Sequence, residues 1–580
     1  LIEDLQRKEA KHVWHPMTQQ RSWSNDEAKP PAAVHYAHNS TLYSLDGSTK
    51  LDAMGGLWCV NVGYGREELA RVAYDAMVQL PFLSPSNGSI PQIELATKIS
   101  ELLDWGAPAH AYFTASGSEA NEAAFKIARQ FHASNIEQDP SWPLRYKIIS
   151  RHRAYHGNTA GAMAATGQAE RKIGFGPQPP GYIKVGTPYP YRSRESNEQH
   201  GLDLAASLDE TIRMEGAETV AAFICEPITS GGGVLVPPEN YLQEVRRVCD
   251  DHGVLLILDE VVSGFGRTGA MFGHHHYGVT PDIVTLAKGL TSGYQPLGAC
   301  VVSDRVFANF HDCPDKVHQG KVASTLPPRL AHLRSINTYG GHPVACAVGL
   351  RNIEIVEREG LVERAAEMGA FLKKSLEDVI GLHRNVGEVR GRGLLIGVEL
   401  VADRDTKTPL DDDACGAVVR RCADAGVVVG RNASTVPGLG NVLILAPPFV
   451  IEEHECARVA ETLRANCTLT SASCIAKGDG RAGHFRINAH EDHVRWCAYR
   501  CAYAPDAGGI GDAQQKRSSQ LRVVRLFQRR QCHGQQHQRR RRGMAPRKVG
   551  VKRRAGEARR LETGLQLPRL HRVSDSCRST

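Results

Sequence analysis

The sequence predicts an α/β protein in which a large, mostly parallel sheet is followed by a smaller α+β unit. From about Trp58 to Phe307, short aliphatic runs alternate with segments of helical periodicity, which is the order that parallel strands joined by crossover helices produce. A second set of helix-like and aliphatic segments runs from Pro343 to Ala465, and beyond it the apolar periodicity stops. We therefore expect two packed domains and a C-terminal tail of different character.

The predicted domain boundaries follow these changes in pattern. Residues 1–57 are expected to contribute to the smaller domain, residues 58–340 to form the large domain, and residues 341–466 to form the small C-terminal domain. Residues 467–580 make up the tail. The chain has 580 residues, of which 41% are hydrophobic, so it can bury two substantial cores.

The composition argues against several classes of protein. No run of about 18 uncharged apolar residues occurs, and the first residues lack the basic and then apolar order of a secretory signal. The 15 cysteines form no C-x-x-C pairs, so neither a zinc site nor a disulfide framework is indicated. We expect a cytoplasmic protein without a membrane-spanning segment.

Strand and helix candidates alternate along both predicted domains. In the large domain, strand candidates cover residues 146–150, 221–227, 253–260, 282–289 and 298–303, with helix candidates at 119–131 and 240–253. In the small domain, a helix-like stretch covers 345–379, strand candidates cover 393–401 and 441–447, and a closing helix covers 452–465. Active groups are expected at the carboxyl ends of the parallel strands.

Two charged residues lie at the ends of predicted buried strands. Asp259 follows five aliphatic residues, where an unpaired charge is costly, so its position requires a partner. Lys288 lies 29 residues further on, at the end of another apolar run. A partly desolvated amine has a lowered pKa and forms Schiff bases with carbonyl compounds. Taken alone, a surface lysine that caps a strand is the simpler interpretation of Lys288.

Two loops upstream of Asp259 carry further candidate groups. In FTASGSEANEAAFKIARQF (113–131), Gly117 allows close backbone approach, and the N–H groups around Ser118 at a helix start suit a phosphate. An ordinary capping loop is the alternative. In SRHRAYHGNT (150–159), Tyr155 and His156 follow a strand-like segment, where an aromatic ring could stack on a planar ligand or fill core space.

Together these four elements are the parts of a pyridoxal phosphate site. They are a phosphate loop, a stacking aromatic residue, a strand-end aspartate and a strand-end lysine, in that chain order. The aspartate would pair with the protonated ring nitrogen of the cofactor, which makes the ring an electron sink. This cation is the partner that makes a carboxylate acceptable at position 259.

Six motifs resemble, in order, those of the class III or omega aminotransferases, which have the fold type I architecture of pyridoxal-phosphate-dependent transferases. The motifs are SGSEANEAAFKIAR, YHGNT, CEPI, DEVVSGFGRTG, PDIVTLAKGL and TYGGHPVACAVGL. The similarity extends from about Lys11 to Ala465. An α/β transferase that moves an amino group between an amine and a keto acid is therefore expected.

The resemblance also implies roles for individual residues. Lys288 would form the Schiff base with the cofactor and then act as general base, and Asp259 would hold the pyridine nitrogen, in a ping-pong reaction. The other implied cofactor contacts are phosphate binding by Gly117 and Ser118, ring packing by Tyr155 and Val261, and positions near the ring for His156 and Glu226. Thr338 would reach the phosphate of the partner subunit, so a homodimer is expected.

Three more stretches resemble a subgroup that contains taurine–pyruvate aminotransferases, namely HVWHPMTQ (12–19), DAMGGLWCVNVGYGR (52–66) and GQAERKIGFGP (167–177). There, Trp58 would line the substrate pocket with Trp14 beside it. Arg171 would hold the sulfonate or carboxylate of the donor, because a guanidinium donates several hydrogen bonds to an anion; without the resemblance, a solvated surface arginine is the simpler interpretation. Arg431 is the candidate for binding the acceptor carboxylate. The expected substrates are an omega-amino donor, such as taurine, β-alanine or another primary amine, and a keto acid, with pyruvate favoured.

The histidine run GHHHYG (273–278) is not expected to bind a metal. Adjacent histidines point in different directions, and no carboxylate or cysteine completes a ligand set. A structural role is the preferred interpretation.

The tail differs sharply in charge from the rest of the chain. From Cys467 onward there are 25 Lys and Arg against 8 Asp and Glu, whereas the first 466 residues carry 45 and 55. Such a segment could bind nucleic acid or be disordered. Because Arg outnumbers Lys by 21 to 4 and six of the 15 cysteines fall here, we favour out-of-frame translation. Nucleic-acid binding is not expected.

Alternative functions stay open at the level of sequence. Within the resembled family, these are a diaminononanoate aminotransferase of biotin synthesis and a glutamate-semialdehyde aminomutase. From a different class, the basic tail would suit a nucleic-acid-binding protein that carries an inactive enzyme domain.

Overall fold

The computed structural model describes residues 1–20, 33–134, 145–310, 317–318, 321–322 and 332–476. Residues 1–480 form one compact unit, and the second unit, 481–580, lies outside the described residues. The predicted tail is therefore described only up to residue 476, and its origin stays a prediction.

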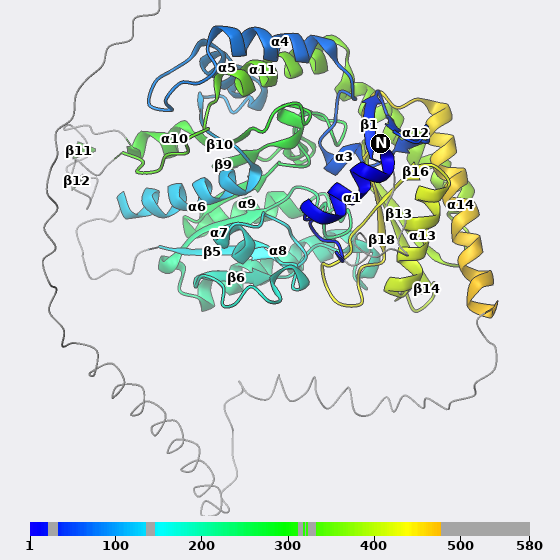
Figure 1. The fold of residues 1–580 in the computed structure, drawn as a ribbon. Helices are drawn as coiled ribbons and strands as arrows, with labels where there is room; N and C mark the ends of the chain where they lie inside the picture. The colour runs from blue at the N-terminus through cyan, green and yellow to red at the C-terminus, as the bar shows by residue number, and fades with distance from the viewer. Residues whose placement is uncertain (21–32, 135–144, 311–316, 319–320, 323–331, 477–580) are drawn as a thin grey trace, which may run out of the picture. The chain divides into compact units, whose positions relative to one another are not determined.

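A seven-stranded sheet, with strands drawn from residues 109–303, forms the centre of the predicted large domain (Figure 1). Its strands, in spatial order, are β4 (Ala109–Thr114), β10 (Gly298–Ser303), β9 (Ile283–Leu286), β8 (Leu255–Asp259), β7 (Val220–Cys225), β5 (Lys147–Arg151) and β6 (Tyr182–Val185). Strand β10 is antiparallel to both of its neighbours, and the strands from β9 to β6 pair in parallel. The predicted α/β fold with a mostly parallel sheet is confirmed.

The two edge strands, β4 and β6, are the ones that the sequence pattern does not predict. The five predicted strands are the inner ones, and the side chains of β7, β8 and β9 are buried throughout. In contrast, β4 and β6 each contain three half-buried residues. These half-buried residues are consecutive and include polar side chains, so both strands lack the continuous aliphatic run that marks a fully buried strand.

Both faces of the seven-stranded sheet are covered, and strand β8 shows how. Leu256 and Leu258 belong to the core under helix α9 (Tyr241–His252), whereas Leu255 and Ile257 belong to the core under helix α6 (Gly117–Ser134). Because side chains alternate along a strand, Asp259 continues the row that faces α6. The next residue along the chain faces the opposite side.

A second sheet and three helices form a separate core toward the C-terminus. The sheet contains β13 (Val386–Arg392), β14 (Leu395–Asp403), β18 (Val442–Leu445) and β17 (Gly430–Arg431), with β15 (Thr408–Pro409) paired to β14. Helices α12 (Leu361–Ile380), α13 (Asp412–Asp424) and α14 (Glu453–Ala476) lie beside it (Figure 1).

The N-terminal segment pairs with this C-terminal part of the chain. A four-stranded sheet has the order β1 (Val34–His38), β2 (Thr41–Ser44), β3 (Thr49–Asp52) and β16 (Val427–Val428). Leu51 of β3 and Val427 of β16 are partners in a parallel pair. The division into domains at residues 57, 340 and 466 stays a prediction.

Further α-helices and strands lie outside these three sheets. They are α1 (Ile2–His12), α3 (Gly55–Trp58), α4 (Glu67–Gln79), α5 (Ile90–Leu103), α7 (Ala160–Ala165), α8 (Asn197–Met214), α10 (Asp304–Phe307), α11 (Pro343–Arg358), β11 (Val317–His318) and β12 (Lys321–Val322). A short 3₁₀ helix, η1, covers Glu170–Lys172. Within the described ranges, no helix combines the length and apolar character needed to cross a bilayer; the cytoplasmic location stays a prediction.

Two predicted helical segments differ from the structure. The stretch 345–379 is two helices, α11 and α12, because Gly360 adopts a left-handed φ of 61° between them. The closing helix α14 continues to Ala476 instead of ending near Ala465. Its sequence contains neither Gly nor Pro up to that point, and Cys467 is 1% exposed against the C-terminal core. The packed helix therefore crosses the predicted boundary at residue 466.

Candidate active site

A cavity of about 180 Å³ lies where strands β8 and β9 end. Asp259 is the last residue of β8, and Lys288 lies two residues beyond the end of β9. The strands are parallel neighbours, with Asp259 paired to Thr285, so their carboxyl ends meet at one edge of the sheet. Of the predicted site residues, the cavity is lined by Trp58, Gly117, Ser118, Tyr155, His156, Glu226, Asp259, Val261 and Lys288.

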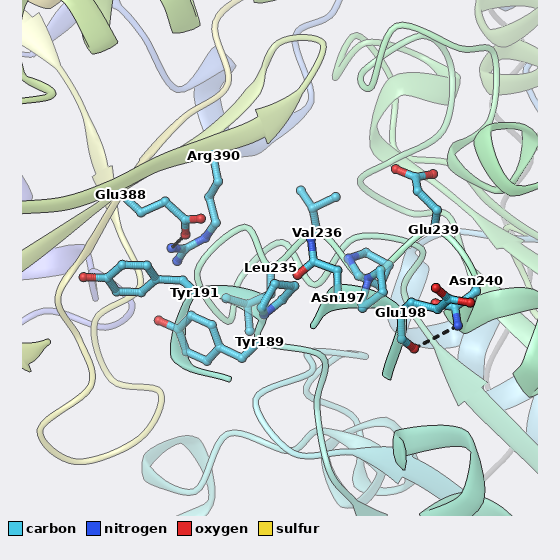
Figure 2. Close-up of a pocket in the computed structure, with 13 residues that line it drawn as sticks. Tyr189, Tyr191, Asn197, Glu198, Leu235, Val236, Glu239, Asn240, Glu388 and Arg390 are labelled. Carbon is cyan, nitrogen blue, oxygen red and sulfur yellow. Dashed lines mark hydrogen bonds and ion pairs between the residues drawn. The ribbon is translucent and has the colours of Figure 1, made fainter. Parts of the chain in front are cut away.

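A larger cavity, of about 540 Å³, lies elsewhere and contains no predicted site residue (Figure 2). Tyr189 and Tyr191 lie on one side of it, Glu388 and Arg390 come from strand β13, and Asn240 donates a hydrogen bond of 3.0 Å to the backbone oxygen of Glu198. Arg390 is paired with Glu388 at 2.7 Å. Size alone does not identify an active site, whereas the smaller cavity gathers the predicted reactive groups.

The carboxylate of Asp259 is held by three donors and is 4% exposed. Its Oδ2 accepts hydrogen bonds from His156 Nδ1 at 2.8 Å and from Asn121 Nδ2 at 2.9 Å, and its Oδ1 accepts one from the backbone N–H of Val261 at 3.1 Å. A carboxylate can accept about four hydrogen bonds. Oδ1 therefore retains capacity for a further donor, which suits a protonated ring nitrogen.

Glu260, the next residue, is held on the other side of the sheet. Its carboxylate accepts hydrogen bonds from Ser263 Oγ at 2.5 Å, the backbone N–H of Gly273 at 2.9 Å, and both the backbone N–H and the Nδ1 of His274 at 2.8 Å. Burial alone would raise the pKa of Glu260, but His274 and the other donors hold it below its ordinary value. His274, one of the histidines of the run 273–278, therefore donates to Glu260. The described residues contain no cluster suited to a metal ion.

Lys288 has the environment of a reactive amine. Burial lowers the pKa of Lys288, although the negative charge of Asp259 acts in the opposite direction. Its backbone has a φ of 47°, a left-handed conformation that is uncommon for a residue with a side chain. Such backbone strain persists where the surroundings hold a residue in place, and it is frequent at functional sites.

The segment predicted to bind phosphate lies at the start of helix α6. A Cβ atom at Gly117 would lie 2.9 Å from a methyl group of Val261, so the close approach of these two segments requires glycine. The backbone N–H of Glu119 donates to Ser116 Oγ at 3.3 Å. Glu119 is thus not available for a phosphate, and the N–H groups of Gly117 and Ser118 at the positive end of the helix dipole are the remaining candidates.

Tyr155 and Glu226 line the same cavity from neighbouring strands. Glu226 follows β7, is 4% exposed, and accepts hydrogen bonds from the backbone N–H of Tyr155 at 3.1 Å and of Ser230 at 2.9 Å. Burial raises the pKa of Glu226. These bonds fix the position of the Tyr155 backbone, while its side chain faces the cavity together with Val261.

Trp58 enters the cavity on a strained turn. It lies two residues after the glycine pair at 55 and 56 and has a φ of 60°. Asp52 holds this turn by accepting hydrogen bonds from the backbone N–H groups of Met54 at 2.9 Å and Gly56 at 2.7 Å. The Nζ atom of Lys288 lies 5.8 Å from the centre of the Trp58 ring, so the tryptophan is adjacent to the reactive amine.

Arg171 lies next to the cavity without lining it. Its guanidinium carbon is 5.0 Å from the centre of the Tyr155 ring, and its Nε donates to Gln168 Oε1 at 2.6 Å. The guanidinium thus lies over the ring of a residue that does line the cavity.

Three predicted site residues are not brought to the cavity. Trp14 is 86% exposed, and Thr338 lies in an exposed turn. Arg431, on strand β17, donates from Nη1 to the backbone oxygen of Asp412 at 2.8 Å and to its carboxylate at 3.1 Å. Their roles stay predictions, and that of Thr338 concerns a second subunit.

Asn121 is a residue of the site that the sequence reasoning missed. Its Nδ2 donates to Asp259 and, at 2.6 Å, to the backbone oxygen of His156, while its Oδ1 accepts from Thr285 Oγ1 at 2.8 Å. It lies four residues after Gly117 in helix α6, so both are on one helix face. That spacing is the signal that could have found it.

The fold and the cavity together define a site for pyridoxal phosphate. A buried amine suits the aldehyde, a helix N-terminus suits the phosphate, and a buried carboxylate with spare acceptor capacity suits the ring nitrogen. Comparison with known proteins agrees, because residues 23–466 match the family model described as Aminotransferase class-III. The chain belongs to the class III aminotransferases and depends on pyridoxal phosphate.

Relatives share most of the chain. It is 43% identical to the uncharacterized aminotransferase YhxA of Bacillus subtilis over 79% of this chain and 96% of the relative. It is 38% identical to the taurine–pyruvate aminotransferase of Rhodobacter capsulatus over 78% of this chain and 94% of that enzyme. A crystal structure of a Bacillus anthracis aminotransferase superposes with a TM-score of 0.74 at 42% identity, covering 80% of this chain and 98% of that one.

Proposed function

We propose that this aminotransferase uses an omega-amino donor, such as taurine, β-alanine or another primary amine, and a keto acid acceptor, with pyruvate favoured. The observation that carries this proposal is the position of Arg171, stacked on Tyr155 beside the cavity. A guanidinium there suits the sulfonate or carboxylate at the far end of the donor. The similarity to the taurine–pyruvate aminotransferase of Rhodobacter capsulatus supports the same donor class.

The proposed chemical roles follow from the geometry. When bound, pyridoxal phosphate supplies an aldehyde and an electron sink. The electron sink makes the proton on the carbon atom that bears the donor's amino group acidic. We propose that Lys288 removes and returns that proton, since its burial favours the neutral amine that a base requires. Asp259, fixed by Asn121 and His156, would keep the ring nitrogen protonated. The two substrates would react in turn, in a ping-pong sequence.

The remaining contacts bind and orient the cofactor and the substrate. Tyr155 and Val261 would pack on the ring, Gly117 and Ser118 would bind the phosphate, and His156 and Glu226 would lie near the ring. Trp58 would restrict the substrate side of the cavity, with Trp14 near it. We further propose a homodimer in which Thr338 completes the phosphate site of the partner subunit. A role for Arg431 in binding the acceptor would require it to leave Asp412.

Alanine formation from taurine and pyruvate tests the donor class. We expect the full chain, supplied with pyridoxal phosphate, to form alanine from pyruvate with taurine or β-alanine, and Arg171→Ala to raise KM for these donors. Failure with both donors, together with turnover of an amine that has no anionic group, would contradict the proposed role of Arg171, and failure with every primary amine would contradict the proposed donor class.

Activity assays with other substrates separate two alternative functions from the proposed one. Turnover with diaminononanoate precursors, or isomerisation of glutamate semialdehyde without a second substrate, would instead support those family members. An inactive domain on a nucleic-acid-binding protein is disfavoured, because both Lys288 and Asp259 are present and face one cavity.

A further inference from the structure

Gln168 is a buried polar residue beside the cavity, and the proposed reaction gives it no role. It is 0% exposed and follows helix α7 in the segment that leads to η1. Its Nε2 donates to the backbone oxygen of Arg153 at 3.1 Å, and its Oε1 accepts from Arg171 Nε at 2.6 Å. Both ends of the amide are therefore used, one by the backbone and one by Arg171.

The orientation of this amide is fixed. If the amide flipped, Nε2 would face the Nε–H of Arg171, and Oε1 would face the oxygen of Arg153, so two hydrogen bonds would become two repulsive contacts. Burial adds to this constraint, because no water can compensate polar atoms that are fully buried and unpaired. Gln168 consequently presents a rigid acceptor to Arg171.

Gln168 also lies close to the part of the cavity that Trp58 and Tyr155 line. A Cβ atom built on Gly231 would lie 3.3 Å from Gln168 Nε2, 3.6 Å from the Trp58 ring and 3.6 Å from Tyr155 Cβ. Gly231 itself lines the cavity. The four residues are therefore neighbours around one point.

The hydrogen bond to Gln168 uses Nε of Arg171 and spares its terminal nitrogens. Within the described part of the chain, the only acceptor of these terminal nitrogens is the sulfur of Met17, 3.8 Å from Nη1, and thioether sulfur is a weak acceptor. With Nε engaged by Gln168, Nη1 and Nη2 can still form two parallel hydrogen bonds with a carboxylate or sulfonate. Gln168 on one side and the Tyr155 ring on the other fix the plane of this fork.

We propose that Gln168 is a positioning residue for donor selectivity, which fixes Arg171 so that its two terminal nitrogens receive the anionic end of the donor. This inference rests on the proposed function, in which Arg171 binds that end. Gln168 itself touches neither donor nor cofactor and acts through Arg171. Its removal would leave the charge of Arg171 in place but free its side chain to rotate toward solvent, which costs affinity through lost preorganisation.

The test measures anion binding separately from catalysis. Isethionate carries the sulfonate of taurine but no amine, so it cannot react, and its binding to the cofactor-loaded full chain can be followed by calorimetry. We expect Gln168→Leu to weaken isethionate binding by about five- to tenfold, which is within the range for the net contribution of one intramolecular hydrogen bond. Arg171→Ala should weaken it further, and Gln168→Leu should have no additional effect in the Arg171→Ala background.

Kinetics provide the second readout. The ratio of kcat/KM for taurine to that for an amine without an anionic group should fall in Gln168→Leu by a similar factor, through KM for taurine. Gln243→Leu is a control for the loss of a hydrogen bond from a glutamine to the backbone, because Gln243, which is exposed, donates to the backbone oxygen of Tyr277 at 2.7 Å away from the cavity. If Gln168→Leu does not fold, Gln168→Met, with an unbranched side chain of similar length, replaces it.

The outcomes separate this inference from the proposed function. If the unaltered protein binds isethionate and Gln168→Leu binds it equally well, Gln168 has no positioning role, while the function stands. An equal loss with both donor types, or an equal loss in the Arg171→Ala background, would show a purely structural role and overturn the inference. If the unaltered protein does not bind isethionate, the proposal of an anionic donor fails, and the inference fails with it.

Discussion

The protein contains two buried carboxylates whose contacting groups differ. Asp259 lies in the candidate active site, and Glu399 lies beside the larger cavity of Figure 2. Glu399, in strand β14, accepts hydrogen bonds from Arg390 at 2.7 Å, from Arg192 at 2.5 Å and from the hydroxyl of Tyr189 at 2.5 Å. In contrast, Asp259 has no arginine or lysine in salt-bridge contact within the described residues, and its neighbour is the ring of His156, whose Nδ1 lies 2.8 Å from Oδ2.

The difference distinguishes a structural carboxylate from a functional one. Burial alone would raise the pKa of Glu399, but Arg390, Tyr189 and Arg192 hold it below its ordinary value. That charge is fully compensated inside the protein, whereas Asp259 is fixed mainly by polar donors and keeps an acceptor site facing a cavity that also contains Lys288. A buried charge whose compensation is incomplete is expected where a charged ligand completes it.

Asp259→Asn should have the largest effect on catalysis. The substitution keeps the shape of the side chain but removes the negative charge that stabilises a protonated ring nitrogen. We expect kcat to fall by about 10²- to 10⁴-fold, the range typical of a lost acid–base group, with little change in thermal stability. An Asp259→Asn enzyme with nearly normal kcat would show that this carboxylate does not control the cofactor.

Glu399→Gln should have the opposite profile. Removing Glu399 from this buried ion-pair network leaves Glu388 as the remaining carboxylate partner of Arg390, and breaking such a buried pair costs up to about 3–5 kcal/mol of folding stability. We expect a lower melting temperature by differential scanning calorimetry, with kcat of the folded protein within about threefold of normal, because Glu399 does not line the active-site cavity. A large fall in kcat without loss of stability would contradict the comparison.

The pH dependence of stability should also depend on Glu399. Its folded pKa lies below its ordinary value of 4.5, so the unfolded state takes up a proton first as the pH falls. The contribution of Glu399 is therefore complete above about pH 4.5 and is lost as the pH falls further toward the folded pKa. Melting temperatures between pH 3.5 and 6 should fall less steeply below about pH 4.5 in Glu399→Gln than in the unaltered protein.

A smaller effect is expected from the position of a C-terminal truncation. Ending the chain after Asn466 removes Cys467, which is 1% exposed in the C-terminal core, whereas ending it after Ala476 keeps all of helix α14. Loss of a small buried side chain costs about 1 kcal/mol. In a unit of this size such a change shifts the melting temperature by about 1 °C, so the longer form should melt about 1 °C higher at equal activity. Equal melting temperatures would show that the last turns of α14 contribute nothing.

The sequence predicts the inner parts of the fold and the site better than the outer ones. Continuous aliphatic runs mark the buried strands, so the positions of Asp259 and Lys288 at strand ends can be predicted from pattern alone. Edge strands β4 and β6, which are partly exposed, carry no such run. Contacts between distant segments, such as Asn121 with Asp259, need the three-dimensional arrangement, because 138 residues separate them.

The substrate side is the least predictable part. Arg171 reaches the site through its contacts with Gln168 and Tyr155, and no periodicity in the sequence indicates such a contact. Arg431 illustrates the reverse case, since its sequence position is suggestive but the fold pairs it with Asp412. Long side chains at the surface of a cavity are directed by their neighbours and not by the secondary structure that carries them.

The covalent state of Lys288 offers the most direct test. Treatment of the cofactor-loaded protein with borohydride fixes a Schiff base irreversibly, and peptide mapping by mass spectrometry then locates the modified residue. We expect the modification on the peptide that contains Lys288, and its absence in Lys288→Ala. Attachment to another lysine, such as Lys184 or Lys172, or an unmodified Lys288 in an active preparation, would contradict the assignment of this cavity as the active site.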